Sequence, residues 1–468
     1  MKFISTRLNA PHLNFEEVIF QGLASDGGLY IPEFLPQFDD KKLKEYRKLS
    51  YAELFYEITK VFIDKEIPHD DYKKIVEDSY KNFQHLAIAP IKQLDKNHFL
   101  LELFHGPTLA FKDFALQFLG NVLNYFLKIN HQKIVIIGAT SGDTGSAAIQ
   151  GCMHCENAEI FIMHPHQKVS DVQRRQMTTI IKDNVYNIAL EGNFDDCQNL
   201  VKKMFSDQSF LKGKKMVAVN SINFARIMAQ IVYYFYSALR LGSDEKTPIS
   251  FTVPSGNFGD IYAGFLAKKM GLHINKLIIA TNDNDILVRF LENNDYSKKT
   301  MVETLSPSMN IQVASNFERL LYDAHKANKI EQKLSDLMHE FNRTGSLSIE
   351  NQVHQFIKKD FCAYKIDDEK TIASIQKYFQ QTGEILDPHT AIGTIATEQF
   401  FHNPEYRGEI VVTLATAHPA KFPEAVKKAS IESVPLPNFL KDLFDRKEEF
   451  TVLNNNLEEI KNFIASKI

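Results

Sequence analysis

A lysine at the start of a predicted helix is the first residue of this sequence that could do chemistry. Lys112 lies in the segment HGPTLAFKDFALQFLG at 105–120, where Gly106 and Pro107 indicate a turn and Asp113 suits the first turn of a helix. Apolar residues then recur at helical spacing, so the helix should face a core. A lysine partly desolvated there is a better nucleophile, because burial disfavours its ammonium form. The alternative is an ordinary solvated lysine at a helix end, and spacing alone leaves both interpretations open.

Two glycine-rich loops, each between a predicted strand and a predicted helix, are the second feature of chemical interest. The first is GATSGDTG at 138–145, and the second is PSGNFG at 254–259. Glycines let backbone N–H groups approach an anion, and a helix N-terminus adds partial positive charge. Neither loop has the G-x-G-x-x-G dinucleotide pattern or the Gly-Lys-Ser/Thr ending of a nucleotide-binding loop. Each loop alone could be tight packing, but the pair together with Lys112 favours a phosphate-bearing cofactor and an anionic substrate.

The pair Cys152 and Cys155 forms a C-x-x-C, which is a pattern of metal or redox sites. No second C-x-x-C follows, and Glu156 stands where haem attachment needs a histidine. The pair also follows a predicted helix instead of opening one, so no helix N-terminus lowers the thiol pKa. We therefore predict structural thiols and no metal site.

The elements that position the loops are predicted from about Phe104 onward, where short β-branched runs alternate with longer amphipathic segments. This alternation predicts βαβ units around a largely parallel sheet. The predicted strands are Ile134–Ile137, Ile160–Met163, Val185–Leu190, Met216–Val219, Ser250–Val253, Leu277–Ala280 and Ile410–Leu414. The predicted helices include Asp113–Leu127, Thr144–Cys152, Ser170–Ile181, Phe224–Leu239 and Asp260–Met270. The last fifty residues show helix-like patterns with many charges and should pack on the outside.

The first hundred residues are predicted to be mostly helical after an extended opening. Ser50 and Glu53 predict a capping box for a helix through about Phe62, and Asp70–Phe83 predicts a second helix. A chain of 468 residues exceeds what one core usually covers. We predict an N-terminal region at 1–100, an α/β domain carrying Lys112 at 101–245 and a second α/β domain at 246–468.

The composition narrows the classes of protein to which the chain can belong. Hydrophobic residues make up 44% and charged residues 24%, as in globular proteins. The net charge is −4 with basic residues spread along the chain, so no binding of nucleic acid or of an anionic membrane is expected. The apolar runs are strand-length and the start has no signal-peptide core, which predicts a cytoplasmic protein without membrane spans.

Several longer segments resemble motifs of the threonine synthase family, in order from the first thirty residues to beyond residue 420. They are GLASDGGLYIP at 22–32, HGPTLAFKD at 105–113, ATSGDTGSAA at 139–148, VNSINFARIMAQ at 219–230, PSGNFGD at 254–260, SPSMNIQVASNFERLL at 306–321, LDPHTAIG at 386–393 and LATAHPAKF at 414–422. Their length and order make a chance match implausible. The opening segment is similar to the longer form of these enzymes, which has an extra N-terminal region.

The resemblance implies a type II pyridoxal-phosphate fold, with pyridoxal 5'-phosphate held between two doubly wound α/β domains. Lys112 matches the Schiff-base lysine, and the cofactor phosphate would be held by backbone amides of Ser255, Gly256, Asn257, Phe258 and Gly259. Asp143 matches the residue near the ring hydroxyl, where many relatives of this fold have Asn. Thr416 matches the hydroxyl residue near the pyridine nitrogen, which should leave that nitrogen largely unprotonated.

Candidate substrate residues follow from the same resemblance and from the chemistry of phosphate. Thr140, Ser141, Gly142 and Thr144 match the loop that meets the substrate carboxylate. Arginine forks and hydroxyls suit phosphate oxygens, so Lys168, Ser170, Arg174, Arg175, Asn223 and Arg226 are candidates for the substrate phosphate. A solvated basic helix face is the alternative for the residues of 168–175. His105, His389 and His418 could line the cleft, although histidines beside turns are often structural.

The reaction implied is the conversion of O-phospho-L-homoserine and water to L-threonine and phosphate, with Lys112 as mobile base and acid. The nearest alternative is a lyase that releases an oxo acid and ammonia from the same substrate. A dehydratase or sulfhydrylase of the same fold fits the N-terminal region and PSGNFG less well. The alternative of another class is a non-catalytic relative, which should have lost the lysine or the phosphate loop. A monomer and a homodimer are both compatible with the sequence.

Overall fold

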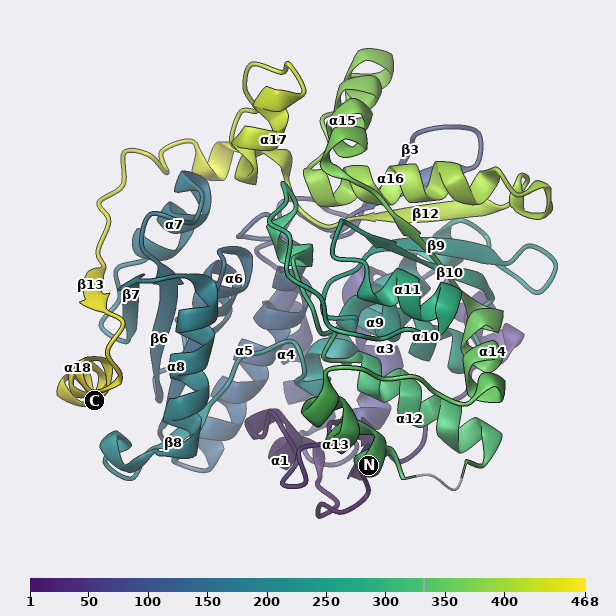
Figure 1. Ribbon diagram of the computed structural model, residues 1–468. Helices are drawn as coiled ribbons and strands as arrows, with labels where there is room; N and C mark the ends of the chain where they lie inside the picture. Colours follow the sequence, from purple (N-terminus) through teal and green to yellow (C-terminus); the bar gives the residue numbers. More distant parts are fainter. Residues whose placement is uncertain (331–332) are drawn as a thin grey trace.

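The structure is a computed structural model that describes residues 1–330 and 333–468. Two large sheets, each covered by helices, lie side by side in Figure 1, and a third sheet has only two strands. The smaller sheet is entirely parallel, in the order β13-β7-β6-β5-β8. Its strands are β5 (Ile134–Ala139), β6 (Ala158–Pro165), β7 (Val185–Glu191), β8 (Lys215–Val217) and β13 (Thr451–Asn454). Its helices are α5 (Lys112–Ile129), α6 (Asp143–Cys152), α7 (Asp171–Thr178), α8 (Phe194–Ser206) and α18 (Leu457–Lys467).

The larger sheet has the order β11-β10-β9-β12-β4-β3, and only the β3–β4 pair is antiparallel. Its strands are β3 (Ile91–Gln93), β4 (His98–Glu102), β9 (Ile249–Pro254), β10 (Ile274–Thr281), β11 (Phe361–Lys365) and β12 (Ile410–Ala415). The helices around it are α10 (Gly259–Lys269), α11 (Ile286–Asn293), α12 (Phe317–Asn328), α13 (Leu334–Thr344), α14 (Asn351–Asp360), α15 (Asp368–Thr382), α16 (Pro388–Phe401) and α17 (Pro423–Lys428). The central strand β9 is fully buried, as expected for a parallel sheet covered on both faces.

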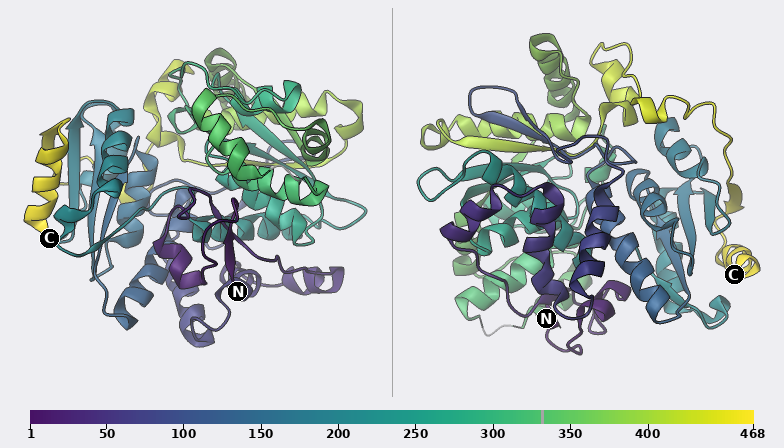
Figure 2. Two further views of the ribbon diagram at one scale, coloured as in Figure 1. Left: turned by 60° about the horizontal axis from the view of Figure 1, so that its bottom comes forward. Right: turned by 180° about the vertical axis from the view of Figure 1, so that it is seen from behind.

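The long helix α9 (Phe224–Arg240) is buried along all but its last residue and contacts both α5 and α10. The N-terminal region packs against α5 and α9, and Figure 2 shows it beneath the two sheets. Its elements are β1 (Phe3–Ser5), α1 (Phe15–Phe20), β2 (Tyr30–Pro32), α2 (Asp40–Tyr46), α3 (Tyr51–Ile63) and α4 (His69–Tyr80). The capping box of Ser50 and Glu53 is present at the start of α3, as predicted.

Sheet membership does not follow the order of the chain. β13 at 451–454 returns to the smaller sheet and pairs with β7, although these residues fall in the predicted second domain. β3 and β4 precede Lys112 but belong to the larger sheet. The expectation of a helix-like C-terminal region therefore needs a correction at β13, which is a strand of the smaller sheet. Among the described residues, no helix combines the length and apolarity that a bilayer crossing requires.

Candidate active site

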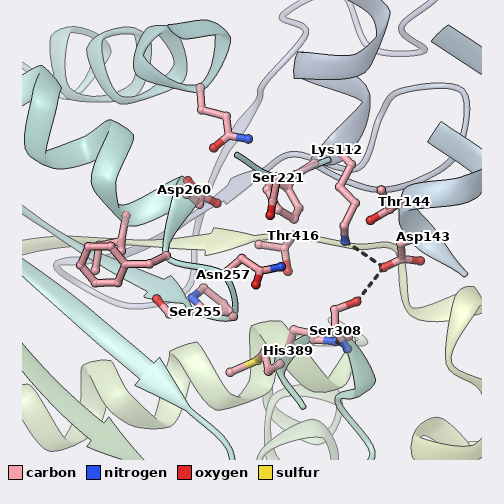
Figure 3. Close-up of a pocket in the computed structure, with 18 of the residues that line it drawn as sticks. Lys112, Asp143, Thr144, Ser221, Ser255, Asn257, Asp260, Ser308, His389 and Thr416 are labelled. Carbon is pink, nitrogen blue, oxygen red and sulfur yellow. Dashed lines mark hydrogen bonds and ion pairs between the residues drawn. The ribbon is translucent and has the colours of Figure 1, made fainter. Parts of the chain in front are cut away.

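One pocket collects residues from the ends of strands in both sheets (Figure 3). The loops after β5, β9 and β12 all reach it, which is where parallel α/β sheets bind ligands. The residues that line it include Lys112, Asp143, Thr144, Ser221, Arg226, Gln230, Ser255, Gly256, Asn257, Phe258, Gly259, Asp260, Ser308, His389 and Thr416. The pocket therefore brings together Lys112, both glycine-rich loops and Thr416, which the sequence predicted to lie near the pyridine nitrogen.

Lys112 is the first residue of α5 and is buried, with 9% of its surface exposed. Its position is set by the preceding residue, because the Phe111 amide donates a 2.8 Å hydrogen bond to the carbonyl of Thr416 at the end of β12. The Nζ atom lies 3.3 Å from Asp143 Oδ2. Burial lowers the pKa of Lys112, and the neighbouring Lys421 lowers it further, while Asp143 opposes both. The solvated interpretation of this lysine is thus excluded, and burial favours the neutral, nucleophilic form of its amine relative to a lysine in water.

Asp143 is shared between two lysines. Its Oδ1 atom lies 3.0 Å from Lys421 Nζ and also accepts a 2.9 Å hydrogen bond from Gln173 Nε2. Ser308 Oγ donates to Oδ2, next to Lys112. Burial alone would raise the pKa of Asp143, but Lys421 and then Lys112 hold it well below its usual range. The carboxylate is therefore ionised and orients Lys112.

Lys421 has no exposed surface and donates a 2.6 Å hydrogen bond to the carbonyl of Thr108. It follows β12 in a short turn, so no helical or strand periodicity marks it in the sequence. The signal that could have identified it is a lysine flanked by apolar residues in LATAHPAKF. A lysine buried this completely requires an anion, and Asp143 supplies it.

In the loop after β5, backbone amides donate hydrogen bonds to a side chain of the same loop. Thr140 Oγ1 accepts hydrogen bonds from the amides of Gly142, at 2.9 Å, and Gly145, at 2.8 Å. Gly142 has a φ of 137°, and a Cβ there would lie 2.5 Å from the Gln173 side chain, so glycine is required twice over. Asp143 then opens α6 with its carboxylate at the helix N-terminus. Ser141 points to a neighbouring groove and Thr144 lines the pocket.

In the loop after β9, by contrast, several backbone amides have no acceptor in the described part of the protein. Within the described chain, the amides of Gly256, Asn257 and Phe258 donate to no protein acceptor. The Asn257 carbonyl is held by the amide and side chain of Asn316, at 3.0 and 2.9 Å. A Cβ on Gly256 would lie 2.6 Å from the carbonyl of Ser308. These amides, followed by the N-terminus of α10, suit a phosphate.

The three candidate histidines have structural partners. His389 lines the pocket, but its Nδ1 atom lies 2.8 Å from Asp387 and its Nε2 accepts from the Ser308 amide at 3.3 Å. His105 contacts Glu102 at 2.7 Å, and His418 caps a short turn. Burial lowers the pKa of His418 to about 4. His105 and His418 do not line the pocket.

The candidate substrate residues separate into four groups, of which the first, Thr144 and Arg226, lines the pocket itself. Ser141, Lys168 and Ser170 line a groove of about 720 Å³ beside the pocket, together with Gln173 and Lys421. Thr140, Gly142 and Asn223 lie inside the structure, where Asn223 caps α9 and donates to the Ile19 carbonyl at 2.8 Å. Arg174 and Arg175 turn to Glu448 at 2.9 and 3.3 Å and line neither cavity.

Sequence reasoning missed Lys421, Ser308 and Gln173, which all contact Asp143. Cys152 and Cys155 are free, buried thiols at the end of α6, and Cys155 donates to the Gly120 carbonyl. Their surroundings fit the predicted structural role.

A buried amine, an open set of amides at a helix N-terminus and a hydroxyl residue at a third strand end fit the aldehyde, phosphate and ring of pyridoxal phosphate. Residues 85–338 match the family described as pyridoxal-phosphate dependent enzyme, so the chain belongs to that class. Residues 2–80 match the threonine synthase N terminus, and residues 390–464 match the threonine synthase C-terminal family. The chain belongs to the threonine synthase family.

Whole-length relatives support the same assignment. Threonine synthase of Pseudomonas aeruginosa is 54% identical over 99% of this chain and 98% of that protein. The crystal structure of PLP-bound threonine synthase from Brucella melitensis has a TM-score of 0.95 and 46% identity, and covers 100% of this chain and 99% of that one. Yeast threonine synthase has a TM-score of 0.94 and 40% identity, covering 100% and 98%. The expected type II fold and its cofactor, pyridoxal phosphate, are thereby confirmed.

Proposed function

We propose that this chain converts O-phospho-L-homoserine and water to L-threonine and phosphate. The observation that carries the proposal is the buried Lys112, placed between the two glycine-rich loops in a chain that matches threonine synthases from end to end. Pyridoxal phosphate, when bound, supplies an electron sink for negative charge at the substrate carbons. Lys112 and the loops around it would bind the ligands and move the protons.

Lys112 is the residue that holds the cofactor and then moves protons. Burial lowers the pKa of the amine, which favours its action as a base at Cα and afterwards at Cβ of the substrate. Phosphate leaves from Cγ, and water adds at Cβ, so the atoms of substrate and water are all accounted for in threonine and phosphate. Asp143 keeps the Nζ atom within 3.3 Å, which limits where that base can reach.

Substrate contacts are proposed in the groove beside Asp143. Ser141, Lys168 and Ser170 line it and offer two hydroxyls and one cation to a phosphorylated amino acid. Thr144 faces the cofactor pocket and lies at the start of α6, where a carboxylate is favoured. Asp143 lines the pocket and contacts Gln173 and Lys421, which line the groove, so we propose that substrate in the groove reaches Lys112 past this carboxylate.

The experiment that tests the proposal is phosphorus and proton NMR of the cofactor-loaded protein with O-phospho-L-homoserine. Equal amounts of threonine and phosphate are expected. An oxo acid, ammonia and phosphate would instead assign the chain to the lyase alternative. A visible cofactor band without any turnover would contradict the substrate assignment and leave the cofactor site intact.

We further propose that the enzyme acts in the cytoplasm as a monomer or homodimer and without nucleic acid. The spread of basic residues and the net charge of −4 support the absence of a nucleic-acid partner. Light scattering after size-exclusion chromatography would give the oligomeric state, and a trimer or larger species would contradict the proposal.

A further inference from the structure

Arg319 is a fully buried arginine that the chemistry above does not use. It lies in the motif SPSMNIQVASNFERLL at 306–321, it is the third residue of α12, and its exposed fraction is 0%. Its guanidinium donates to the carbonyls of Tyr30 and Ile222 and to the side-chain oxygen of Asn316. These acceptors are all uncharged, and burial lowers the pKa of Arg319 to about 10. Arg319 therefore joins three separate segments of the chain at a high cost of desolvation.

Asn316 is the residue through which Arg319 reaches the pocket. It occupies the N-cap of α12, where an asparagine side chain normally accepts from its own helix, but here it makes no such bond. Its oxygen accepts from Arg319 instead, and because a guanidinium only donates, this contact fixes the orientation of the amide. The side-chain nitrogen then donates to the carbonyls of Asn257 at 2.9 Å and Ser221 at 3.2 Å. Both residues line the pocket of Lys112 (Figure 3).

The bond to Asn257 sets the direction of a backbone donor in the loop after β9. The Asn257 carbonyl also accepts from the backbone amide of Asn316 at 3.0 Å, so one residue supplies both of its donors. In a planar trans peptide, the carbonyl and the following N–H point in opposite directions. The Phe258 amide therefore points away from Asn316, and it is one of the three amides without an acceptor in the described chain. Asn316 thus aims a donor that suits a phosphate.

The loop needs this support because its backbone is strained. Phe258 has a φ of 63°, in the left-handed region that aromatic residues rarely adopt. Such a conformation persists only when the surrounding contacts impose it. The ring of Phe258 is buried and packs edge-on against Phe317, the first residue of α12, with 5.4 Å between the ring centroids. The start of α12 therefore holds the loop through the Asn257 carbonyl and through the Phe258 ring.

The same turn of α12 is attached to the N-terminal region. Glu318 accepts two hydrogen bonds of 3.0 Å from Arg7 and one of 2.7 Å from Thr6, which directly follow β1. Arg319 donates to the Tyr30 carbonyl of β2 at 2.8 and 3.1 Å. Since β1 and β2 pair with each other, both attachments reach one small sheet. The N-terminal motif that contains Tyr30 lies outside the lining of the pocket, yet it is connected in this way to the loop that lines it.

We propose that Asn316 and Arg319 are positioning residues for the cofactor phosphate, and that they couple the N-terminal region to cofactor binding. The inference rests on the proposed function for the assignment of the loop after β9 to that phosphate. Asn316 holds the loop in the conformation that presents its amides, Arg319 orients Asn316, and the Tyr30 carbonyl holds Arg319. Phosphate binding and docking of the N-terminal region on α12 favour the same conformation, so each stabilises the other.

The first experiment measures dissociation constants for pyridoxal phosphate and for pyridoxal, which lacks the phosphate, from the visible absorbance of the bound cofactor. It compares wild type, N316A, R319K, the double variant N316A/R319K and the control variant R289K. Arg289 is also a buried arginine, but it is paired with Asp285 and Asp295 and lies outside the lining of the pocket. Lysine keeps the charge of arginine but lacks the planar fork that reaches several oxygens at once.

For N316A we expect the Kd of pyridoxal phosphate to rise about 10-fold and that of pyridoxal by less than about 3-fold, because the phosphate-facing amide has lost its support. R319K should show the same selectivity with a smaller rise of about 3- to 5-fold. The double variant should bind pyridoxal phosphate within about 2-fold of N316A, because Arg319 acts through Asn316. R289K should keep the wild-type ratio of the two constants.

The second experiment measures hydrogen exchange of backbone amides by mass spectrometry, without cofactor and at saturating pyridoxal phosphate. In wild type, the cofactor should slow exchange in the loop after β9 and also at residues 22–32, although these lie outside the lining of the pocket. In N316A, the protection by cofactor should remain in the loop and be lost at residues 22–32. A merely structural role would change exchange in the free and bound protein alike and leave the difference between them.

Equal weakening of both ligands in N316A would make Asn316 a packing residue and overturn the inference. So would a double variant in which the two single effects multiply, since Arg319 would then not act through Asn316. If a variant does not fold, the exchange of wild type still decides, because residues 22–32 without protection by the cofactor would refute the coupling. A wild-type protein that binds pyridoxal phosphate no more tightly than pyridoxal would instead refute the proposed phosphate site itself.

Discussion

The loops after β5 and β9 share one design, a buried strand followed by glycines and a helix, yet they hold different anions. After β5, Asp143 places its own carboxylate at the helix N-terminus and binds Lys112 and Lys421. After β9, Asp260 turns to Tyr233 and Tyr234, and the loop amides remain without acceptors in the described structure. The first loop is therefore filled by the protein, and the second is built for an anion from outside.

The difference shows what a glycine-rich loop can and cannot indicate. Glycines allow backbone donors to converge, but the direction of the first carboxylate of the following helix decides whether a ligand is needed. Both helices carry an aspartate in the first turn, at 143 and 260, so the two patterns look alike in sequence. Only the tyrosines of α9, which hold Asp260 aside, distinguish them.

The largest effect is expected for Lys112, which lies between the two loops. K112A should reduce turnover at least about 10³-fold, since it removes both the amine that holds the cofactor and the proton carrier. The visible cofactor absorbance should disappear while the far-ultraviolet circular dichroism stays that of wild type. Retention of full activity would remove Lys112 from the chemistry and would make the comparison of the loops irrelevant to catalysis.

The D143A variant removes the carboxylate that occupies the helix N-terminus after β5. Two buried lysines then lose their shared anion, and the free energy of unfolding of the apoenzyme should fall by about 3–5 kcal/mol. Urea unfolding measures the change. The double variant D143A/K421M should be more stable than the sum of the two single changes predicts, because one lysine no longer needs a partner. Strict additivity would mean that the carboxylate does not compensate Lys421.

The open loop is tested through the protonation of Asp260, whose pKa is raised by burial to about 6. The folded state then binds more protons than the unfolded state between about pH 4 and 6, so this group costs stability as pH rises through that window. Relative to D260N, wild-type apoenzyme should lose about 2–3 kcal/mol from pH 4 to 6 and nothing more above it. Chemical denaturation between pH 4 and 6 measures the free energy of unfolding of both proteins. If the difference between wild type and D260N did not change with pH, the Asp260 carboxyl would be more solvated than the structure indicates.

The smallest effect is expected outside both loops, at Arg174. Its ion pair with Glu448 is partly exposed, with 24% and 18% of the two side chains accessible. R174Q should therefore lower the free energy of unfolding by less than about 1 kcal/mol and change KM for O-phospho-L-homoserine by less than about 3-fold. Steady-state kinetics would detect a 10-fold rise in KM, which would restore Arg174 as a ligand of the substrate phosphate.

Local signals account for the parts of the structure that were predictable. The seven predicted strands correspond to β5–β10 and β12, because each is a short apolar run next to a turn or helix signal. The turn before Lys112 and the helix after it made this lysine a candidate, but spacing left a solvated lysine open, and the resemblance of HGPTLAFKD to the family motif supplied its predicted role. The loops were identified by their glycines, although only the structure distinguishes the filled loop from the open one.

The remaining features depend on residues far apart in the chain. Lys421 reaches Asp143 from beyond β12, and Glu448 takes Arg174 and Arg175 away from the cavities. Neither pairing leaves a periodic trace in the sequence. β13 is four residues long and follows a charged segment, so its own sequence does not predict a strand. Only its pairing with β7 identifies it as one.

The return of β13 has a consequence for synthesis on the ribosome. Strands β5 to β8 emerge before β9, but the second neighbour of β7 is not made until residue 451. At about 5–20 residues per second, that delay is roughly 10–50 s. During this interval β7 presents a bare hydrogen-bonding edge that invites pairing with another nascent chain. The sheet whose first four strands are made before β9 is thus the one completed last, and its solubility during translation depends on β13 being made in time.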